Sequence, residues 1–388
     1  MRKLRIIQCS DAYYPFPGGV TEHLHHLTLA LRERGHSVDI LTAGYKGAPE
    51  REEGVIRVGK IRILKATKAF NLTQLTLTPI TPGVAKRVKE VVRSGYDIVH
   101  VHGPYAPNLP FLAARASLCP VVATHHTAFV GFNWHKLGRF AFRGLSRRIE
   151  ANIGVSRVAV GEIFPYYPGH NYCIIPNGVD TRRFRPDVPR IEKLAGIKGP
   201  KILYVGRMEP RKGFPYILEA FKLVKREIPD AVLVACGKGP NLELYKESVP
   251  TELRDSVLFE GFIPAELLPS YYASADLYTS PAVGGETFGI VLVEAMACGT
   301  PVVASRISGY AQVIESGVNG ILTDIWDPET YARDIIRVLV DKELYARLRE
   351  AGLRTAERYS WPRVAEQVEA LYYRILEARE RGAHWYQI

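Results

Sequence analysis

The sequence predicts an α/β protein with two doubly wound, Rossmann-like domains. Short apolar strands alternate with helical segments along most of the chain, which indicates parallel sheets covered by helices on both faces. With 388 residues the chain is too long for one ordinary core and suits two domains of about 200 residues each. A turn-rich stretch at residues 176–190 interrupts the alternation and is the expected linker.

In the first half, apolar runs of strand length are separated by segments with helical apolar spacing. The segment 20–35 shows this spacing and closes at Gly35, a residue typical of helix ends. The expected strands are 4–9, 37–42, 55–64 (one or two strands), 97–103, 120–126, 151–156 and 171–176, and the expected helices are 20–35, 82–95, 106–117 and 133–149.

After the linker the alternation restarts, with strands expected at 201–206, 231–236, 256–261, 275–280, 301–305 and 320–323. Long helices are then expected at 328–340, 343–357 and 361–380. Together they are longer than the sheet of one domain needs to cover its faces. We therefore expect an N-terminal domain at residues 1–178, a C-terminal domain at 179–360, and a final segment, 361–388, whose helix crosses back to brace the N-terminal domain.

The composition is that of a folded soluble protein, with 47% hydrophobic and 23% charged residues. No apolar run approaches the roughly 18–20 residues needed to span a bilayer, and the N-terminal apolar run is too short for a signal peptide. The cysteines at positions 9, 119, 173, 236 and 298 form no C-x-x-C pair, so they favour neither a disulfide framework nor a zinc site. These features favour a reducing, cytoplasmic location.

The net charge of +11 lies entirely in the first half of the chain. Residues 1–180 hold 23 Lys and Arg against 12 Asp and Glu, whereas residues 181–388 hold 28 of each kind. Such an excess indicates an anionic partner: a nucleic acid, a membrane surface or a phosphorylated substrate. A charge-rich surface with no partner, of the kind found in thermally adapted proteins, is the alternative.

Part of that excess lies in the helix expected at 133–149. Its arginines Arg139, Arg143 and Arg147 are four residues apart and so share one side of a helix, and the aromatic residues Trp134, Phe140 and Phe142 lie nearby. Cations beside aromatics suit an anionic membrane surface. The alternative is that the aromatics pack inward and the arginines are merely solvated. No nucleic-acid-binding motif accompanies the charge, so no nucleic-acid partner is expected.

In the second half, Arg207 and Lys212 share the loop that follows the strand at 201–206. Ligands of open α/β sheets bind at the carboxyl ends of strands, so these two cations could neutralise a diphosphate without a metal ion. The chain contains no Asp-x-Asp, the pair that would hold a metal on a nucleotide sugar, and this fits a metal-free site. A solvated basic turn is the alternative interpretation.

Two glutamates flank the start of a helix expected at Ile290. The amides of Gly289, Ile290 and Val291 would point out of its N-terminus, where a phosphate binds favourably. Glu294 lies about one turn inside, in an otherwise apolar run, and a ribose diol would satisfy its carboxylate. A structural salt bridge to a core arginine is the alternative. Glu286, in the preceding glycine-rich loop, would lie beside the transferred group.

Glu286 and Glu294 have the E-x7-E spacing of the retaining GT-B glycosyltransferases of family 4, and residues 284–305 resemble that family throughout. Within the family the chain is most similar to phosphatidylinositol mannosyltransferases and their relatives. Further matches occur in the expected order along nearly the whole chain: PGGV (17–20), HVHGPYAP (100–107), VVATHHT (121–127), IPNGVD (175–180) and VGRMEPRKG (205–213).

The resemblance implies that the two domains face each other across a cleft and that the donor is a nucleotide sugar. Arg207 and Lys212 would hold its diphosphate, Glu286 the transferred sugar, and Glu294 the ribose. The donor-binding residues that it implies are Gly18, Gly19, Arg207, Lys212, Ile263, Glu286, Thr287, Phe288, Gly289, Ile290, Val291 and Glu294. The implied catalytic residues are His126, Glu286, Arg207 and Lys212, and the acceptor-side candidates are His102, Thr127 and Arg211.

The family places one histidine directly before a threonine at the end of a strand, which corresponds to His126 here. His125 precedes it, and successive strand residues point to opposite faces, so only one of the two can enter the cleft. We expect it to be His126. His100 and His102 are expected to be structural or to lie on the acceptor side.

The chain departs from the mannosyltransferases at two places. They have a carboxylate two residues after the position of Ile263, where this chain has Ala265 followed by Glu266, so both GDP-mannose and a UDP-hexose stay open as donors. The phosphoinositide enzymes have a basic residue after His-Thr, where this chain has AFVGF (128–132). The acceptor therefore stays open among lipid-linked, phosphorylated and saccharide hydroxyls.

Taken together, these features predict a retaining hexosyltransferase that needs no cofactor and no metal besides its nucleotide-sugar donor. It is expected in the cytoplasm, with its basic half on the inner membrane face. Its oligomeric state is not predicted. The alternatives are a non-catalytic, nucleotide- or membrane-binding protein with tandem Rossmann-like domains, and a GT-B sugar epimerase or phosphorylase.

Overall fold

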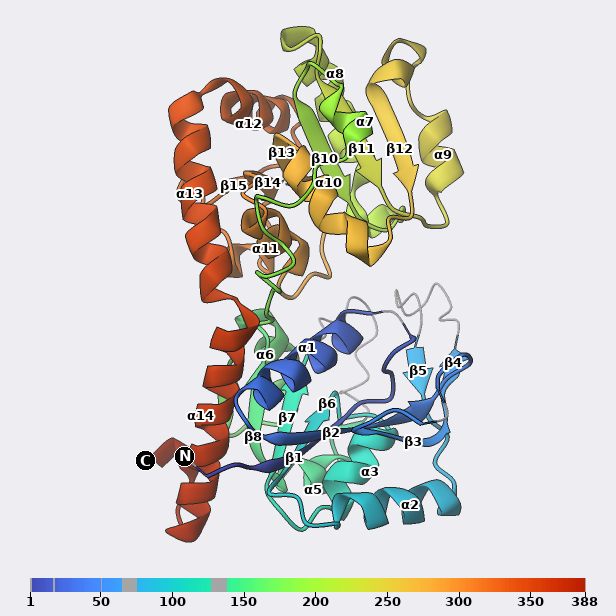
Figure 1. The fold of residues 1–388 in the computed structure, drawn as a ribbon, viewed down its shortest axis with the longest axis vertical. Coiled ribbons are helices and arrows are strands. Elements are labelled where there is room, and N and C mark those ends of the chain that lie inside the picture. The colour runs from blue at the N-terminus through green and yellow to red at the C-terminus, as the bar shows by residue number, and fades with distance from the viewer. Residues whose placement is uncertain (1, 17, 50, 65–74, 127–137, 388) are drawn as a thin grey trace. The chain divides into compact units, whose positions relative to one another are not determined.

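The computed structural model describes residues 2–16, 18–49, 51–64, 75–126 and 138–387, and the chain divides into two compact units (Figure 1). The first unit comprises Met1–Gly178 together with Trp361–Ile388, and the second comprises Val179–Ser360. Each unit is a parallel sheet covered by helices on both faces, so the prediction of two doubly wound, Rossmann-like α/β domains is confirmed.

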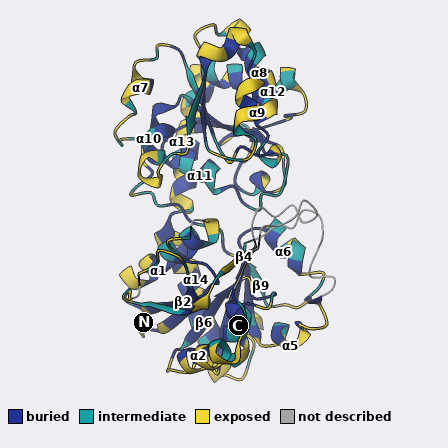
Figure 2. Cartoon of the chain, turned by 90° about the vertical axis from the view of Figure 1, so that its right-hand side faces the viewer, coloured by how far each residue is buried: buried dark blue, intermediate teal, exposed yellow. Residues whose placement is uncertain are grey.

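The sheet of the first unit has seven parallel strands in the order β3-β2-β1-β6-β7-β8-β9. Its central strands are apolar and buried, as a sheet covered on both faces requires (Figure 2). The strands are β1 (Arg5–Cys9), β2 (Ser37–Gly44), β3 (Val55–Lys60), β6 (Ile98–His102), β7 (Val121–His125), β8 (Ile149–Gly154) and β9 (Tyr172–Ile174), while β4 (Arg62–Leu64) and β5 (Leu75–Leu77) form a separate antiparallel pair.

Several helices of the first unit begin at side chains that satisfy their free backbone amides. Asn108 Oδ1 accepts from Phe111 N at 2.9 Å, and Ser156 Oγ accepts from Ala159 N at 3.1 Å. The helices are α1 (Gly19–Glu33), α2 (Pro82–Val92), α3 (Leu109–Ala116), α5 (Arg143–Ser146), α6 (Arg157–Ile163) and α14 (Trp361–Glu380), followed by the 3₁₀ turn η6 (Trp385–Gln387).

The C-terminal helix α14 packs against α1 and so belongs to the first unit (Figure 1). Its buried Glu369 accepts a hydrogen bond from Arg34 Nε at 2.8 Å. His36 Nδ1 accepts from the amide of Leu4, so the other ring nitrogen, Nε2, donates to Glu369 Oε1 at 2.7 Å. Burial opposes the charge of Glu369, but the hydrogen bonds from Arg34 and His36 outweigh it and lower the pKa of this carboxyl.

The second unit contains six parallel strands in the order β12-β11-β10-β13-β14-β15. These strands are β10 (Lys201–Val205), β11 (Val232–Cys236), β12 (Val257–Gly261), β13 (Leu277–Ser280), β14 (Val302–Ser305) and β15 (Ile321–Thr323). The helices are α7 (Glu192–Ala195), α8 (Phe214–Glu227), α9 (Leu242–Glu247), α10 (Leu268–Ser274), α11 (Ile290–Ala297), α12 (Pro328–Val340) and α13 (Lys342–Arg358), with 3₁₀ turns η2 (Pro210–Lys212), η3 (Thr251–Ser256), η4 (Ala265–Leu267) and η5 (Tyr310–Gln312).

The single helix expected at 133–149 is wrong in the part that the structure describes after residue 138, which is itself helical. Residues 139–142 form turns, α5 covers only Arg143–Ser146, and β8 already begins at Ile149. Gly138 and Gly144 weaken a continuous helix, and burial of Ile149 in the sheet ends it. Arg139, Arg143 and Arg147 are all exposed, but they do not share one side of a helix. Trp134 lies outside the described residues.

Each sheet contains one switch point, which is the place between two neighbouring strands where the connections on either side run in opposite directions. In the first unit it lies between β1 and β6, and in the second between β10 and β13. The loops that leave these strands diverge there, and ligands of doubly wound sheets bind in that crevice, at the carboxyl ends of the strands. No helix in the described ranges is long and apolar enough to cross a membrane.

Candidate functional site

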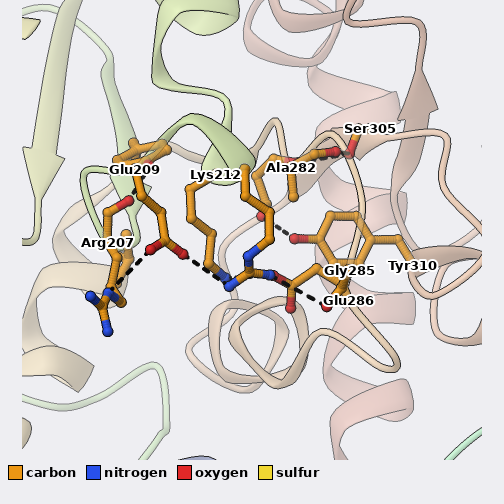
Figure 3. A network of polar contacts seen from close by, with 12 residues as sticks. Arg207, Glu209, Lys212, Ala282, Gly285, Glu286, Ser305 and Tyr310 are labelled. Atoms are coloured by element: carbon orange, nitrogen blue, oxygen red, sulfur yellow. Dashed lines mark hydrogen bonds and ion pairs between the residues drawn. The ribbon is translucent and has the colours of Figure 1, made fainter. Parts of the chain in front are cut away.

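The loops that follow β10 and β13 meet at the switch point of the second unit and bring five charged side chains together (Figure 3). The centre of this group is Glu286, whose side chain is 15% exposed. Its Oε1 accepts hydrogen bonds from Lys212 Nζ and from an Arg211 guanidinium nitrogen, each at 2.6 Å. Both cations come from the loop after β10 and the carboxylate from the loop after β13, so the group forms only when the sheet has formed.

A second carboxylate, Glu209, lies on the other side of Arg211. It accepts a hydrogen bond from Arg211 at 3.1 Å and forms an ion pair with Arg207 Nε at 3.5 Å. Burial opposes the charge of Arg211, but the attraction of Glu286 and Glu209 outweighs it and raises the pKa of the guanidinium. Three cations therefore face two carboxylates, and Arg207 is 51% exposed, which leaves positive charge for an anionic ligand.

The segment between Glu286 and α11 is held by close backbone packing. A Cβ on Gly309 would collide with the carbonyl oxygen of Glu286, so glycine permits this approach. Gly289 precedes α11 with φ +84°, a conformation that favours glycine. The amides of Ile290 and Val291 in the first turn of α11 consequently follow a tightly fixed loop, and phosphate binding by them stays a prediction.

Glu294 lies in α11 and is partly buried. It accepts a hydrogen bond at 3.1 Å from the hydroxyl of the buried Tyr272, a residue of α10. Burial, reinforced by the charge of Glu294, raises the pKa of Tyr272 well above its usual range, so its hydroxyl stays a donor. The carboxylate in the apolar run thus has a polar partner from a neighbouring helix.

The other donor-side residues differ in how their side chains are placed. Thr287 and Ile263 are partly buried, and Ile263 packs against the core of the second unit. Phe288 is buried and its ring meets Tyr359 edge to face, so only its backbone could contact a ligand. Ala265 is exposed in η4, and the neighbouring Glu266 is exposed too.

In the first unit, Gly18 and Gly19 follow β1 and start α1. An added Cβ at either position would meet no atom of the described residues within 4 Å. Packing within the unit therefore does not explain this glycine pair, whereas close approach of a ligand would.

The two adjacent histidines at the end of β7 point to different surroundings. His125 is buried, shares a hydrogen bond with Asn152 Oδ1 at 2.9 Å and stacks on Tyr105. His126 is partly exposed, and its Nε2 lies 3.0 Å from His102 Nδ1. His126 also meets the ring of His23, from α1, edge to face at a centroid distance of 4.6 Å.

Burial keeps the imidazoles of His23, His100, His102 and His126 neutral at pH 7. It lowers the pKa of His23 to about 4 and that of His100 to about 3. It also lowers the pKa of His102 and His126 well below the usual range, and neighbouring imidazoles add to the effect. His100 is fully buried between Tyr372 and Thr124, with a 2.6 Å hydrogen bond to each, as a structural residue is.

The structure brings some predicted residues together and adds others. Arg211, expected on the acceptor side, pairs with Glu286, and Thr127 lies outside the described residues. Sequence reasoning missed Glu209, Tyr272 and His23. Glu209 was detectable as an acid between two cations in one loop, and His23 as part of a histidine-rich segment of a helix, whereas nothing in the sequence marks Tyr272.

Two family models match the chain. Glycosyltransferase Family 4 matches residues 17–183, and Glycosyl transferases group 1 matches residues 190–355. The phosphatidyl-myo-inositol mannosyltransferase of Mycolicibacterium smegmatis is 32% identical over 95% of this chain and 93% of its own. A GDP-mannose-dependent alpha-(1-6)-phosphatidylinositol monomannoside mannosyltransferase of the same organism is 30% identical over 96% and 99%.

Solved structures with the same fold include a glycosyltransferase from Rickettsia africae, with a TM-score of 0.76, 19% identity, and coverage of 97% of this chain and 99% of that one. Anabaena HepE in complex with UDP has a TM-score of 0.74 at 20% identity, with coverage of 95% and 99%. At these identities the likeness concerns the fold alone.

Proposed function

Because the chain belongs to the family 4 glycosyltransferases, as its motifs predict, we propose that it transfers a hexosyl group from a nucleoside-diphosphate sugar to an acceptor hydroxyl with retention of the α configuration. The observation that carries this proposal is the charged group at the switch point of the second unit. Glu286 is held there by Lys212 and Arg211 beside the half-exposed Arg207, where a sugar and a diphosphate can be bound side by side.

In the proposed complex, Arg207 and Lys212 bind the diphosphate, together with the amides at the start of α11. Glu294 accepts hydrogen bonds from the ribose, and the Tyr272 hydroxyl orients its carboxylate. Glu286 accepts from hydroxyls of the transferred sugar and keeps that sugar next to the cations. His126 lies on the acceptor side, from the first unit.

The reaction breaks the bond between the anomeric carbon and the diphosphate oxygen. Positive charge develops on the sugar while negative charge develops on the leaving diphosphate, and Arg207 and Lys212 stabilise the latter. The acceptor hydroxyl attacks the face that the diphosphate leaves, and its proton passes to the departing phosphate oxygen, so the configuration is retained. We propose that no metal ion takes part, since two side-chain cations neutralise the diphosphate.

GDP-mannose is the first donor that we propose, because relatives at 30–32% identity are mannosyltransferases and one is named as GDP-mannose-dependent. The exposed Glu266 would supply the carboxylate for the guanine N–H groups. Ala265 at the neighbouring position favours a UDP-hexose as the second candidate. The relatives' names point to a phosphoinositide-type acceptor.

The decisive experiment measures turnover of three donors: GDP-mannose, UDP-glucose and UDP-N-acetylglucosamine. Each donor is tested with phosphatidylinositol, with other glycerolipids, with polyprenyl-linked acceptors and with free saccharides. Release of nucleoside diphosphate together with an α-linked product supports the proposal. A nucleotide-binding protein without catalysis would bind a donor and release nothing, with or without acceptor, and an epimerase would change the sugar without an acceptor.

We also propose that the first unit docks on an anionic membrane surface. Arg139, Arg143 and Arg147 are exposed, and the Phe140 ring beside them is 72% exposed, with the Arg139 guanidinium 4.6 Å from its centroid. An exposed aromatic ring among cations suits the boundary between lipid head groups and acyl chains. Such docking would bring the protein to a lipid-linked acceptor.

A further inference from the structure

Three histidines from separate parts of the first unit converge on one point. His23 comes from α1, His102 ends β6, and His126 follows β7. One nitrogen from each ring lies within 4.8 Å of the other two. His23 and His102 are buried and His126 is partly exposed, so the group at the carboxyl ends of β6 and β7 has two buried members and one partly exposed member.

Amide oxygens fix the tautomers of the two buried rings. Gln8 donates through Nε2 to Thr28, so its Oε1 accepts from His102 Nε2, 3.1 Å away. Asn177 Oδ1 likewise accepts from His23 Nδ1 at 2.9 Å. The protonated nitrogens therefore point to the amides, and the lone pairs are on His102 Nδ1 and His23 Nε2.

This is the arrangement that a metal-binding imidazole requires. A ligating histidine normally donates its other ring N–H to an oxygen acceptor, which orients the ring and selects the tautomer. Two nitrogens on one tetrahedral Zn²⁺ lie about 3.3 Å apart, given bonds of about 2.0–2.1 Å. His102 Nδ1 and His126 Nε2 are 3.0 Å apart, so only small ring movements separate the present hydrogen bond from shared coordination.

We propose that His23, His102 and His126 form a binding site for Zn²⁺ or a similar transition-metal ion. Neutral imidazole suits zinc and its neighbours, whereas Mg²⁺ and Ca²⁺ prefer oxygen ligands. Three protein nitrogens leave a fourth position for water, as in open zinc sites. The ion replaces the proton in the His126–His102 hydrogen bond, and that proton passes to the other nitrogen of His126 or to water.

The site has a consequence for transfer, and this consequence rests on the proposed function. His126 cannot hold a metal ion and contact the acceptor or the sugar through the same nitrogen. Bound zinc would therefore inhibit transfer, and removal of zinc would restore it. The ion is an inhibitor in this scheme and has no part in the transfer chemistry.

The binding test uses the full-length protein, stripped of metal and dialysed against ZnCl₂, with bound zinc measured by atomic emission. Co²⁺ titration adds an absorption spectrum that reports nitrogen coordination. One equivalent should bind, and His23→Gln and His126→Gln should each weaken binding at least 100-fold. His26→Gln is the matched control, since His26 lies on the same helix as His23 and outside the group of three.

Asn177→Leu tests the orientation of His23 without removing a ligand. It should weaken zinc binding about 10- to 100-fold, the usual effect of losing such an orienting partner. Because His126 is partly exposed, His126→Gln should keep the melting temperature and so carries the test if His23→Gln fails to fold. Zinc binding that is equal in wild type, His126→Gln and His26→Gln would overturn the site, as would the absence of any stoichiometric binding.

A second experiment measures inhibition of turnover by zinc. It compares wild type with Asn177→Leu by the zinc concentration that halves the metal-free rate of each protein. The value should rise about tenfold or more in the variant. If no donor and acceptor pair is turned over, the proposed function fails while the binding measurements still decide the site. Equal zinc sensitivity in the two proteins would contradict inhibition through this site.

Discussion

Lys212 Nζ lies 2.6 Å from Glu286 Oε1, although the two residues are 74 positions apart in the chain. The pair joins the loop after β10 to the loop after β13, and Arg211 contacts the same carboxylate oxygen. In the proposed complex Lys212 would contact both Glu286, which would bind the sugar, and the diphosphate, and would so couple the two halves of the donor.

Lys212→Met should lower kcat/KM about 100-fold, equivalent to about 3 kcal/mol, because it removes a charged hydrogen bond and a cation that faces the leaving group. Steady-state kinetics measure the loss. The control is Lys222→Met on α8, where the lysine pairs only with the exposed Glu219 among the contacts of the described residues. An unchanged affinity for the nucleoside diphosphate in Lys212→Met, measured by calorimetry, would remove Lys212 from the site.

Glu294→Ala should weaken binding of a nucleoside diphosphate at least tenfold but leave binding of its 2′,3′-dideoxy analogue nearly unchanged. The reason is that, of these two ligands, only the one with intact ribose hydroxyls can make the proposed hydrogen bonds to this carboxylate. Calorimetry on both ligands and both proteins gives the interaction free energy between Glu294 and the ribose hydroxyls directly. Tyr272→Phe should show a smaller change in the same direction, since it removes the hydroxyl that donates to Glu294. Equal losses for the two ligands would favour a purely structural role.

Turnover should survive EDTA, because in the proposed complex Arg207 and Lys212 would supply the positive charge that a metal ion would otherwise bring to the diphosphate. The assay compares metal-stripped enzyme with and without added Mg²⁺ or Mn²⁺. If a three-histidine zinc site exists in the first unit, chelation should raise the rate or leave it unchanged. Complete loss on chelation, reversed by Mg²⁺ or Mn²⁺, would show that the donor needs a metal ion.

Asp11→Asn should stabilise the protein at pH 7 more than at pH 4. Burial raises the pKa of Asp11 from 3.8 to about 6, so ionisation of this carboxyl costs folding free energy as the pH rises through that window. The cost is small below the unfolded pKa and complete above about 6. The gain from the substitution should therefore grow by about 2 kcal/mol between pH 4 and pH 7. Denaturant unfolding at the two pH values measures the gain in the free energy of unfolding. An equal gain at both would contradict a raised pKa of Asp11 in the folded protein.

Replacing Arg139, Arg143 and Arg147 with serine should weaken binding to anionic vesicles. Each cation near anionic lipid contributes about 1 kcal/mol, and added salt should reduce the wild-type binding. Co-sedimentation with neutral and with anionic vesicles measures both effects. A triple Lys→Ser control at Lys222, Lys225 and Lys246 in the second unit removes the same charge elsewhere. Equal recovery with neutral and anionic vesicles would contradict membrane docking.

The sequence was least informative where glycines interrupt a helical pattern and a buried strand follows it closely. Helical spacing of the arginines between 139 and 147 predicted one helix, but Gly138 and Gly144 weaken it and β8 competes for the residues from Ile149 onward. A pattern on the surface does not outweigh burial of an apolar strand in the sheet.

The amino-acid sequence by itself determined the two α/β domains, the order of their elements and the family. Strand and helix periodicities, turn residues and short motifs are local, so they can be recognised without three-dimensional contacts. Only the tertiary structure decided that Arg211 pairs with Glu286 and Glu209, that Tyr272 donates to Glu294, and that His23 joins His102 and His126. Except for Arg211 and Glu209, which lie two positions apart in one loop, these contacts join residues that are distant in sequence. They depend on which strands become neighbours and on how far each side chain reaches once the sheets have formed.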